Sequence, residues 1–360
     1  MVSKQRLVET FIDLVEIDSE SGDEAEIREV LKAKLIALGL ATKVDQKGNL
    51  IATLTGRRNS ARILLSAHMD TVRPGKGVIP VIKKTHIVSK GSTILGADDK
   101  SGIAIILECL ALLRERSTPF PNLHIIFSVE EEIGCKGSQA MKNIPADLGF
   151  VLDTGGPIGT VITSAPSHEK FIARIIGRAA HAGIEPEKGL HAIQIASHVI
   201  AKLKLGRIDD ETVANIGLIH GGKATNIVPD EAVFEGEVRS RSERKLLGQI
   251  RRIQKTIERE CAKRGGKVDI HFTREYNRFD ISGQTQLLSI CKQAADACHL
   301  TLKLQPTGGG SDANFFNALG IPTAVISTGM TNVHTTKETI AISDMMDATR
   351  FLMSLIEAVL

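Results

Sequence analysis

Three apolar segments of this 360-residue chain end abruptly in side chains that can bind a metal ion, and no other feature constrains the fold as much. Arg62–Val72 opens as a buried strand and carries His68 near its end. Leu123–Val129 is followed by three consecutive glutamates, and a third short strand is followed by Asp153. In open α/β sheets the carboxyl ends of the strands lie along one edge, where such folds bind their ligands. The sequence therefore predicts a site at that edge.

Two further acidic side chains belong to the same pattern. His68 and Asp70 are two residues apart on an extended chain, so they point to the same side, and Asp70 can hold the imidazole by its second nitrogen. His-x-Asp alone also fits an ordinary strand end. Asp98 and Asp99 precede an apolar helix expected over residues 103–113, and a helix cap needs only one of them.

The three glutamates at 130–132 repel one another unless a bound cation neutralises their charge. Taken alone, they also fit a solvated acidic turn. Nitrogen and carboxylate ligands without thiolates suit zinc, cobalt or manganese, and one bridging carboxylate lets five side chains hold two ions. Two divalent ions nearly balance three ligand carboxylates and a bridging hydroxide, which such a pair activates for attack on a carbonyl. The candidate ligands are His68, Asp98, Glu132, Asp153 and His334.

The chain is expected to form two domains. Residues 1–165 and 276–360 predict an α/β domain, a mixed sheet with helices on both faces. Residues 166–275 follow the order βαββαβ, which is typical of a compact ferredoxin-like domain inserted between the two segments.

Composition excludes several classes of function. The chain has 45 basic and 42 acidic residues, no Trp and one Tyr, so neither a phosphate-tracking surface nor a stacking platform for nucleic acid is indicated. The five cysteines are scattered, without a C-x-x-C pair, which is typical of reduced thiols. Neither a signal sequence nor a membrane span is recognisable. We expect a cytoplasmic, soluble protein that acts on a small molecule or a peptide.

Five elements of the sequence, in order along almost the whole chain, resemble the motifs of one enzyme family. They are His68-Met-Asp-Thr-Val72, Gly96-Ala-Asp-Asp-Lys-Ser-Gly102, Glu130-Glu-Glu-Ile-Gly134, Asp153 before two glycines, and Asn332-Val-His334. The family is that of the dinuclear zinc metallopeptidases, which includes the tripeptidase peptidase T, aminoacylases, deacetylases and glutamate carboxypeptidases. The resemblance implies a zinc-exopeptidase-like catalytic domain.

The resemblance also implies a role for each matching residue. His68 and Asp153 would bind one ion, Glu132 and His334 the other, and Asp98 would bridge the two. Asp70 would orient His68, and Glu131 would be the general base that activates the bridging water. The Asp98–Asp99 peptide bond is expected to be cis.

The inserted domain would then be a lid and the surface of a homodimer. Its residues His181, Asn226 and Arg239 match positions that contact substrate in the family. Arg suits a planar carboxylate, although a surface strand-end charge is the alternative for Arg239.

The resulting prediction is a two-metal hydrolase that removes the N-terminal residue from short peptides. An N-acyl amino acid deacylase or a carboxypeptidase would use the same metal site. A non-catalytic metal- or peptide-binding protein is a more remote alternative, because binding alone would not need Glu131. The tripeptidase carries Arg before its Gly-Gly-Thr-Asp loop, where this chain has Gly308, so tripeptide specificity stays open.

Overall fold

The computed structural model describes residues 1–116 and 119–359, which divide into two compact units. Unit 1 consists of Met1–Ser164, Asp280–Thr307 and Ser311–Leu360, and unit 2 of Ala165–Phe279 and Gly308–Gly310. Unit 2 is larger than the expected range 166–275. Gly310 lies directly against the Tyr276 ring, where a Cβ would come within 2.2 Å of a ring carbon, and this packing joins residues 308–310 to unit 2.

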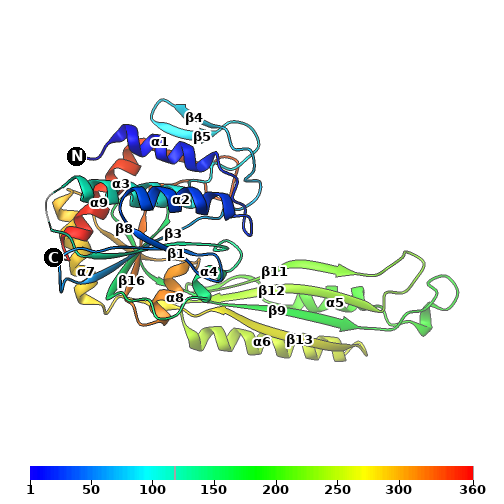
Figure 1. Ribbon diagram of the computed structural model, residues 1–360. Coiled ribbons are helices and arrows are strands. Elements are labelled where there is room, and N and C mark those ends of the chain that lie inside the picture. Colours follow the sequence, from blue (N-terminus) through cyan, green and yellow to red (C-terminus); the bar gives the residue numbers. More distant parts are fainter. Residues whose placement is uncertain (117–118, 360) are drawn as a thin grey trace. The chain divides into compact units, whose positions relative to one another are not determined.

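Unit 1 is a layered α/β structure (Figure 1). Its helices are α1 (Lys4–Val15), α2 (Ala25–Ala37), α3 (Ala97–Glu115), α4 (Lys136–Gln139), α7 (Thr285–Ala297), α8 (Asp312–Ala318) and α9 (Ile342–Glu357). Its main sheet has the order β1 (Ala41–Val44), β2 (Leu50–Leu54), β6 (Asn122–Ser128), β3 (Arg62–His68), β7 (Leu148–Thr154), β16 (Thr323–Ser327), β8 (Thr160–Ala165) and β14 (Phe279–Asp280), and β15 (Lys303–Pro306) pairs with β8. A small separate sheet contains β17 (Thr339–Ala341), β5 (His86–Ser89) and β4 (Pro80–Lys83).

The main sheet is mixed, as expected. The central strand β3 runs parallel to β6 and β7, and β7 runs parallel to β16, whereas β2 is antiparallel to β6. The carboxyl ends of β3, β6 and β7 consequently meet at one edge. Strand β8 was not predicted, because it follows the glycines after Asp153 and lacks a long apolar run.

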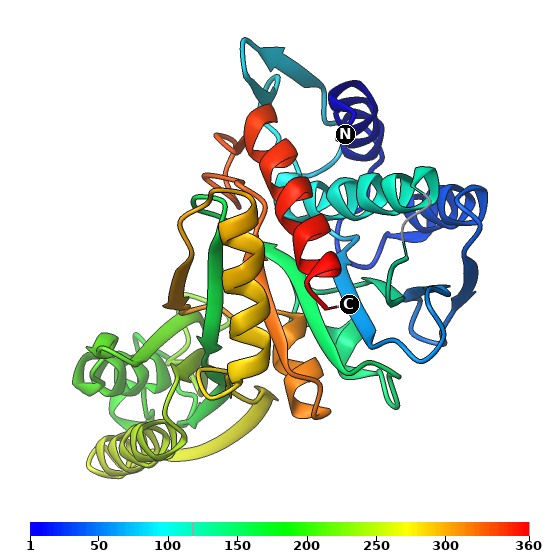
Figure 2. The same ribbon diagram turned by 90° about the vertical axis from the view of Figure 1, so that its left-hand side faces the viewer.

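Helices cover both faces of this sheet. Figure 2 shows α3, α7 and α9 in front of the strands, and α8 packs on β7 and β16 from the other side. Apolar side chains of β3 point alternately to both layers, so six of its seven residues are buried. A strand covered on both faces needs such a continuous apolar run, which explains the pattern read in the sequence.

Unit 2 has the predicted βαββαβ order with one additional short strand. Its elements are β9 (Ser167–Ile176), α5 (Ala192–Lys202), β10 (Gly206–Asp209), β11 (Thr212–Gly221), β12 (Glu231–Ser240), α6 (Glu243–Ala262) and β13 (Lys267–Tyr276). The antiparallel sheet order is β10-β11-β12-β9-β13. Alternate residues of β9, among them Phe171 and Ala173, pack with α5 and α6 in a core of their own.

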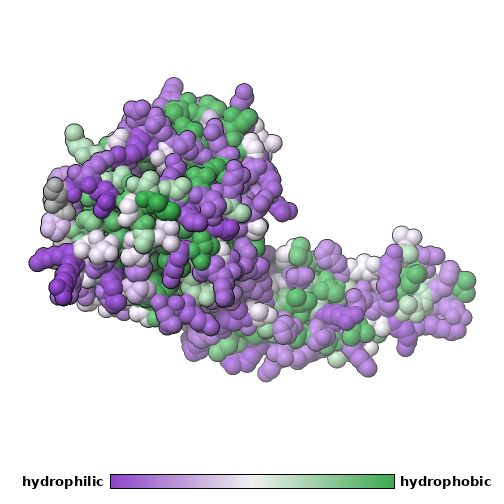
Figure 3. Space-filling view, in the orientation of Figure 1, coloured by the Kyte–Doolittle hydropathy of each residue, from purple (hydrophilic) through white to green (hydrophobic). Residues whose placement is uncertain are grey.

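Polar groups dominate the surface displayed in Figure 3, with apolar groups scattered among them. Over residues 1–116 and 119–359, the structure contains no helix that combines the length and the apolar character of a membrane span.

Gly102 allows α3 to approach β7 closely, and we predict that Gly102→Ala destabilises unit 1 by about 1–3 kcal/mol. A Cβ at residue 102 would lie 2.4 Å from Asp99 Oδ1 and 2.7 Å from the carbonyl oxygen of Leu152. Urea unfolding measures the effect. Gly283→Ala, which meets no atom within 4 Å, is the matched control, and equal midpoints for the two variants would contradict the prediction.

Candidate active site

The side chains singled out in the sequence meet at the shared carboxyl edge of β3, β6 and β7. The parallel register places His68, the last residue of β3, beside Ser128, the last residue of β6. Ligand atoms of His68, Glu131 and Asp153 lie within 4.8 Å of one another, and so do those of His68, Asp98 and Glu132. Both groups therefore share His68.

Asp98 lies between the two histidines and offers a different oxygen to each. Its Oδ1 is 3.1 Å from His68 Nε2, and its Oδ2 is 3.2 Å from His334 Nε2. His334 Nε2 is also 2.9 Å from Glu132 Oε1. The Asp98–Asp99 peptide bond is cis, which confirms the prediction. A carboxylate with its two oxygens directed to two different imidazoles has the arrangement that bridging requires.

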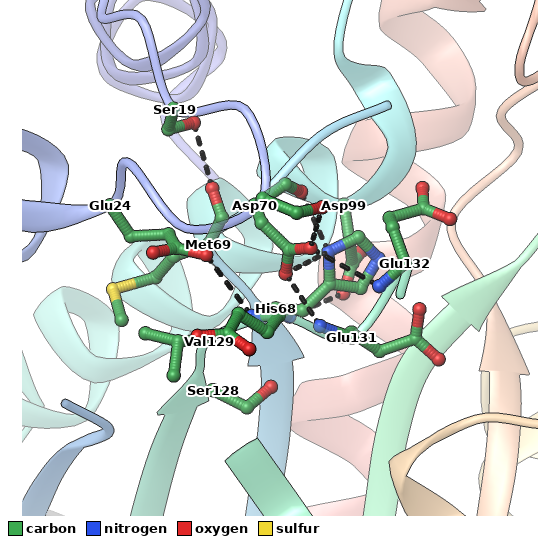
Figure 4. Close-up of polar contacts among 12 residues, drawn as sticks. Ser19, Glu24, His68, Met69, Asp70, Asp99, Ser128, Val129, Glu131 and Glu132 are labelled. Atoms are coloured by element: carbon green, nitrogen blue, oxygen red, sulfur yellow. Dashed lines mark hydrogen bonds and ion pairs between the residues drawn. The ribbon is translucent and has the colours of Figure 1, made fainter. Parts of the chain in front are cut away.

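Asp70 supports this cluster in a different way from the one expected (Figure 4). His68 Nδ1 is 2.8 Å from the backbone carbonyl oxygen of Asp70, but 3.6 Å from its carboxylate Oδ1. The carbonyl is thus the hydrogen-bond partner of the ring, since 3.6 Å is too long for such a bond. The carboxylate instead accepts the backbone N–H groups of Glu131 and Glu132, at 2.9 and 3.1 Å, and the hydroxyl of Ser21. It therefore holds the acidic loop.

Glu131 is buried beside these groups, with 9% of its surface exposed. Burial, together with the nearby carboxylate of Asp312, raises the pKa of its carboxyl group to about 8. The thiol of Cys135 donates to Glu131 Oε1 at 3.1 Å. Glu130, the first of the three glutamates, points away and pairs with Lys47 at 2.6 Å. The neighbouring side chains of Glu130 and Glu131 thus lie in different environments, because the first pairs with a lysine and the second is buried in the acidic cluster.

Three supporting residues were missed by the sequence analysis. Glu338 is buried and accepts the backbone N–H groups of Leu95, Gly96 and Asp98 at 2.7 to 2.9 Å, so it holds the turn that carries Asp98. Asp99 Oδ2 accepts the backbone N–H of His68 at 3.2 Å. The thiol of Cys135 is the third. The contacts of Glu338 and Asp99 join distant parts of the chain, so no local pattern reveals them, whereas Cys135 lies only four residues from Glu131.

The three residues expected to bind substrate lie in unit 2. His181 is exposed, and its Nδ1 accepts the backbone N–H of Gly183 at 3.2 Å. The backbone carbonyl of Asn226 accepts the N–H of Ala182 at 2.9 Å, so Asn226 and His181 belong to adjoining segments. Arg239 is half-buried in β12 and pairs with Glu237 at 3.1 Å.

The cluster in unit 1 has the donor chemistry of a metal site. Asp98, Glu131, Glu132 and Asp153 place four carboxylates close together around two imidazoles. Burial and neighbouring carboxylates raise the pKa of Asp153 well above its usual range. Acids crowded in this way must take up protons or gather cations, and nitrogen and oxygen donors without thiolates suit zinc and similar divalent ions.

Comparisons with known proteins agree with this chemistry. Residues 64–358 match the model of the peptidase family M20/M25/M40. The protein YqjE of Bacillus subtilis is 41% identical, with 99% of each chain covered. A tripeptidase from Staphylococcus aureus has a similar structure, with a TM-score of 0.94 and 36% identity over 100% of this chain and 99% of that one. The aminopeptidase PepT from Bacillus cereus has a TM-score of 0.90 and 39% identity over 99% of both chains. The chain therefore belongs to the peptidase family M20/M25/M40, as a metallopeptidase similar to peptidase T.

Proposed function

We propose that the protein is a two-metal aminopeptidase that removes the N-terminal residue from short peptides. The observation that carries this proposal is the position of Asp98, whose two carboxylate oxygens face two different histidines beside the buried carboxyl group of Glu131. Two similar proteins of known structure, a tripeptidase and the aminopeptidase PepT, support the choice of substrate class.

Under this proposal His68 and Asp153 hold one divalent ion, Glu132 and His334 hold a second, and Asp98 contacts both. Such ions would polarise the peptide carbonyl and lower the pKa of water, so that hydroxide is available to attack the carbonyl at neutral pH. The carboxylates of Glu338 and Asp70 accept backbone N–H groups and so keep the two ligand-bearing turns in place. Zinc as the native metal stays a prediction, with cobalt and manganese as alternatives.

Glu131 serves as the general base. Its carboxyl group takes a proton from the attacking water and gives it to the amine that leaves. The raised pKa suits both halves of this transfer, because a group that titrates near the working pH can accept and return a proton. The Cys135 thiol, which donates to Oε1, fixes the direction of the carboxyl group.

Unit 2 is proposed to be the lid and the surface of a homodimer, with His181, Asn226 and Arg239 in contact with the substrate. Arg239 donates to the carboxylate of Glu237 in the same strand, and a substrate carboxylate would offer its guanidinium the same kind of group. A cytoplasmic location also stays a prediction.

Product analysis with one alanine tripeptide, free and N-acetylated, tests the proposed function on protein reconstituted with zinc or cobalt. We expect cleavage of the free peptide alone, with release of alanine and dialanine. Cleavage of the acetylated peptide alone would replace the aminopeptidase by a deacylase or a carboxypeptidase. No cleavage of either peptide by metal-loaded protein would favour a binding protein.

Glu131→Gln should lower kcat by about 10² to 10⁴-fold, because the amide cannot accept the proton. Its metal content should stay unchanged, which atomic absorption measures. Glu130→Gln is the matched control, since Glu130 pairs with Lys47 and should leave kcat within a few-fold of the wild type. A Glu131→Gln enzyme with full activity would remove the assignment of the base.

Metal removal should destabilise the protein more at pH 8 than at pH 6. In the metal-free folded state burial raises the pKa of Glu131 from 4.5 to about 8, and the ion pairs with Asp98 and Glu132 raise the pKa of His334 from 6.5 to about 10. Between these pH values the folded state keeps protons that the unfolded chain has lost, so its stability falls as pH rises.

Bound metal would take the place of the proton on His334, and its positive charge would lower the pKa of the neighbouring Glu131. The difference in unfolding free energy between metal-loaded and chelated protein should therefore widen by an amount on the order of 2 kcal/mol from pH 6 to pH 8. Thermal unfolding with and without a chelator measures it. A difference that stays constant or shrinks over this range would contradict the proposed ligands.

A further inference from the structure

Unit 1 contains a groove of about 800 Å³ that is separate from the acidic cluster. Its floor is formed by β1, β2 and β6, and its wall by the loop of residues 140–145. A volume of this size falls in the range of sites for small organic ligands, roughly 300 to 1,000 Å³.

The floor is a partly exposed sheet face that carries both apolar and polar side chains. Ile51 pairs with Ile126 across β2 and β6, and Thr53 pairs with His124, so these four side chains point to one face. Ile126 is 1% exposed, whereas Ile51, Thr53 and His124 are half-buried. Leu50, Ala52 and Leu54, on the other face of β2, are buried in the core.

The wall continues this apolar surface. Met141, Ile144 and Pro145 line the groove from the loop that follows α4. Apolar side chains thus face one another across the groove, an arrangement that favours the apolar body of a ligand.

Lysines outnumber acids among the residues that line the groove. Lys43 and Lys142 are exposed at the groove, and neither forms an ion pair within residues 1–116 and 119–359. The acid among the lining residues, Asp45, is occupied by its own turn, where it accepts the backbone N–H groups of residues 47, 48 and 49 at 2.9 Å. Burial lowers the pKa of His124, and the positive charges of Arg62 and Lys43 lower it further.

We propose that this groove binds an amphiphilic monocarboxylate, a medium-chain fatty acid. The chain would lie along Ile51, with the carboxylate between Lys43 and Lys142. An ammonium group would meet two lysines and a single carboxylate, that of Asp45, whose oxygens already accept hydrogen bonds in its own turn. The groove is therefore chemically distinct from a site for free peptides or amino acids, and the inference does not depend on the proposed aminopeptidase activity.

Isothermal titration calorimetry of the full-length protein with sodium decanoate tests the proposal. We expect saturable binding of decanoate, and at least about tenfold weaker binding of butyrate, which lacks the chain, and of decyltrimethylammonium, which reverses the charge. Equal binding of decanoate and decyltrimethylammonium would show that charge does not select the ligand and would overturn the proposal.

Two variants locate the ligand. The double variant Lys43→Glu/Lys142→Glu should weaken decanoate binding by about tenfold or more, and Lys90→Glu, another exposed lysine of unit 1, should not. Ile51→Trp, which fills the groove without changing charge, should also weaken it. Binding that survives in both groove variants would place decanoate elsewhere.

A second copy of the chain is the competing occupant. Absence of saturable heat with decanoate, together with conversion of a dimer to a monomer by Ile51→Trp in sedimentation experiments, would assign the groove to a contact between copies and overturn the proposal.

Discussion

Electrostatic repulsion among buried carboxylates is the constraint on which unit 1 depends. Asp98, Glu131, Glu132 and Asp153 come together at one sheet edge, where burial raises the pKa values of the last three. Two imidazoles compensate part of the charge, and divalent ions are the natural complement. The carboxylates of Asp70 and Glu338 accept backbone N–H groups of the turns that carry the acidic cluster. These hydrogen bonds keep the turns in place despite the repulsion among the clustered carboxylates.

The strand ends were predictable from the sequence because their signal is local. A buried strand must be apolar, so an abrupt charge at its end stands out, and the parallel arrangement of β3, β6 and β7 then brings His68, the glutamates and Asp153 to one edge. The long helices were likewise found by their periodicity. Helix α4 and strands β8, β10, β14 and β17 were missed, because each is short or lacks a strong apolar run.

The supporting contacts could not be predicted in the same way. Glu338 reaches the turn at residues 95–98 from 240 or more positions away, and only the fold brings them together. The partner of His68 Nδ1 was assigned to the right residue but to the wrong atom, because spacing in sequence does not distinguish the Asp70 carbonyl from its carboxylate. The boundary of unit 2 depended on the contact between Gly310 and the Tyr276 ring, which has no sequence signature.

The order of strands in the main sheet has a consequence for biosynthesis. Strand β16, from the last segment of the chain, lies between β7 and β8, which are made much earlier. A nascent chain therefore lacks an interior strand of the sheet, and it also lacks His334, until these segments have been translated. Before that point the chain cannot bring His334 beside Asp98 and Glu132. The main sheet can therefore be completed only after the inserted unit 2 has been translated.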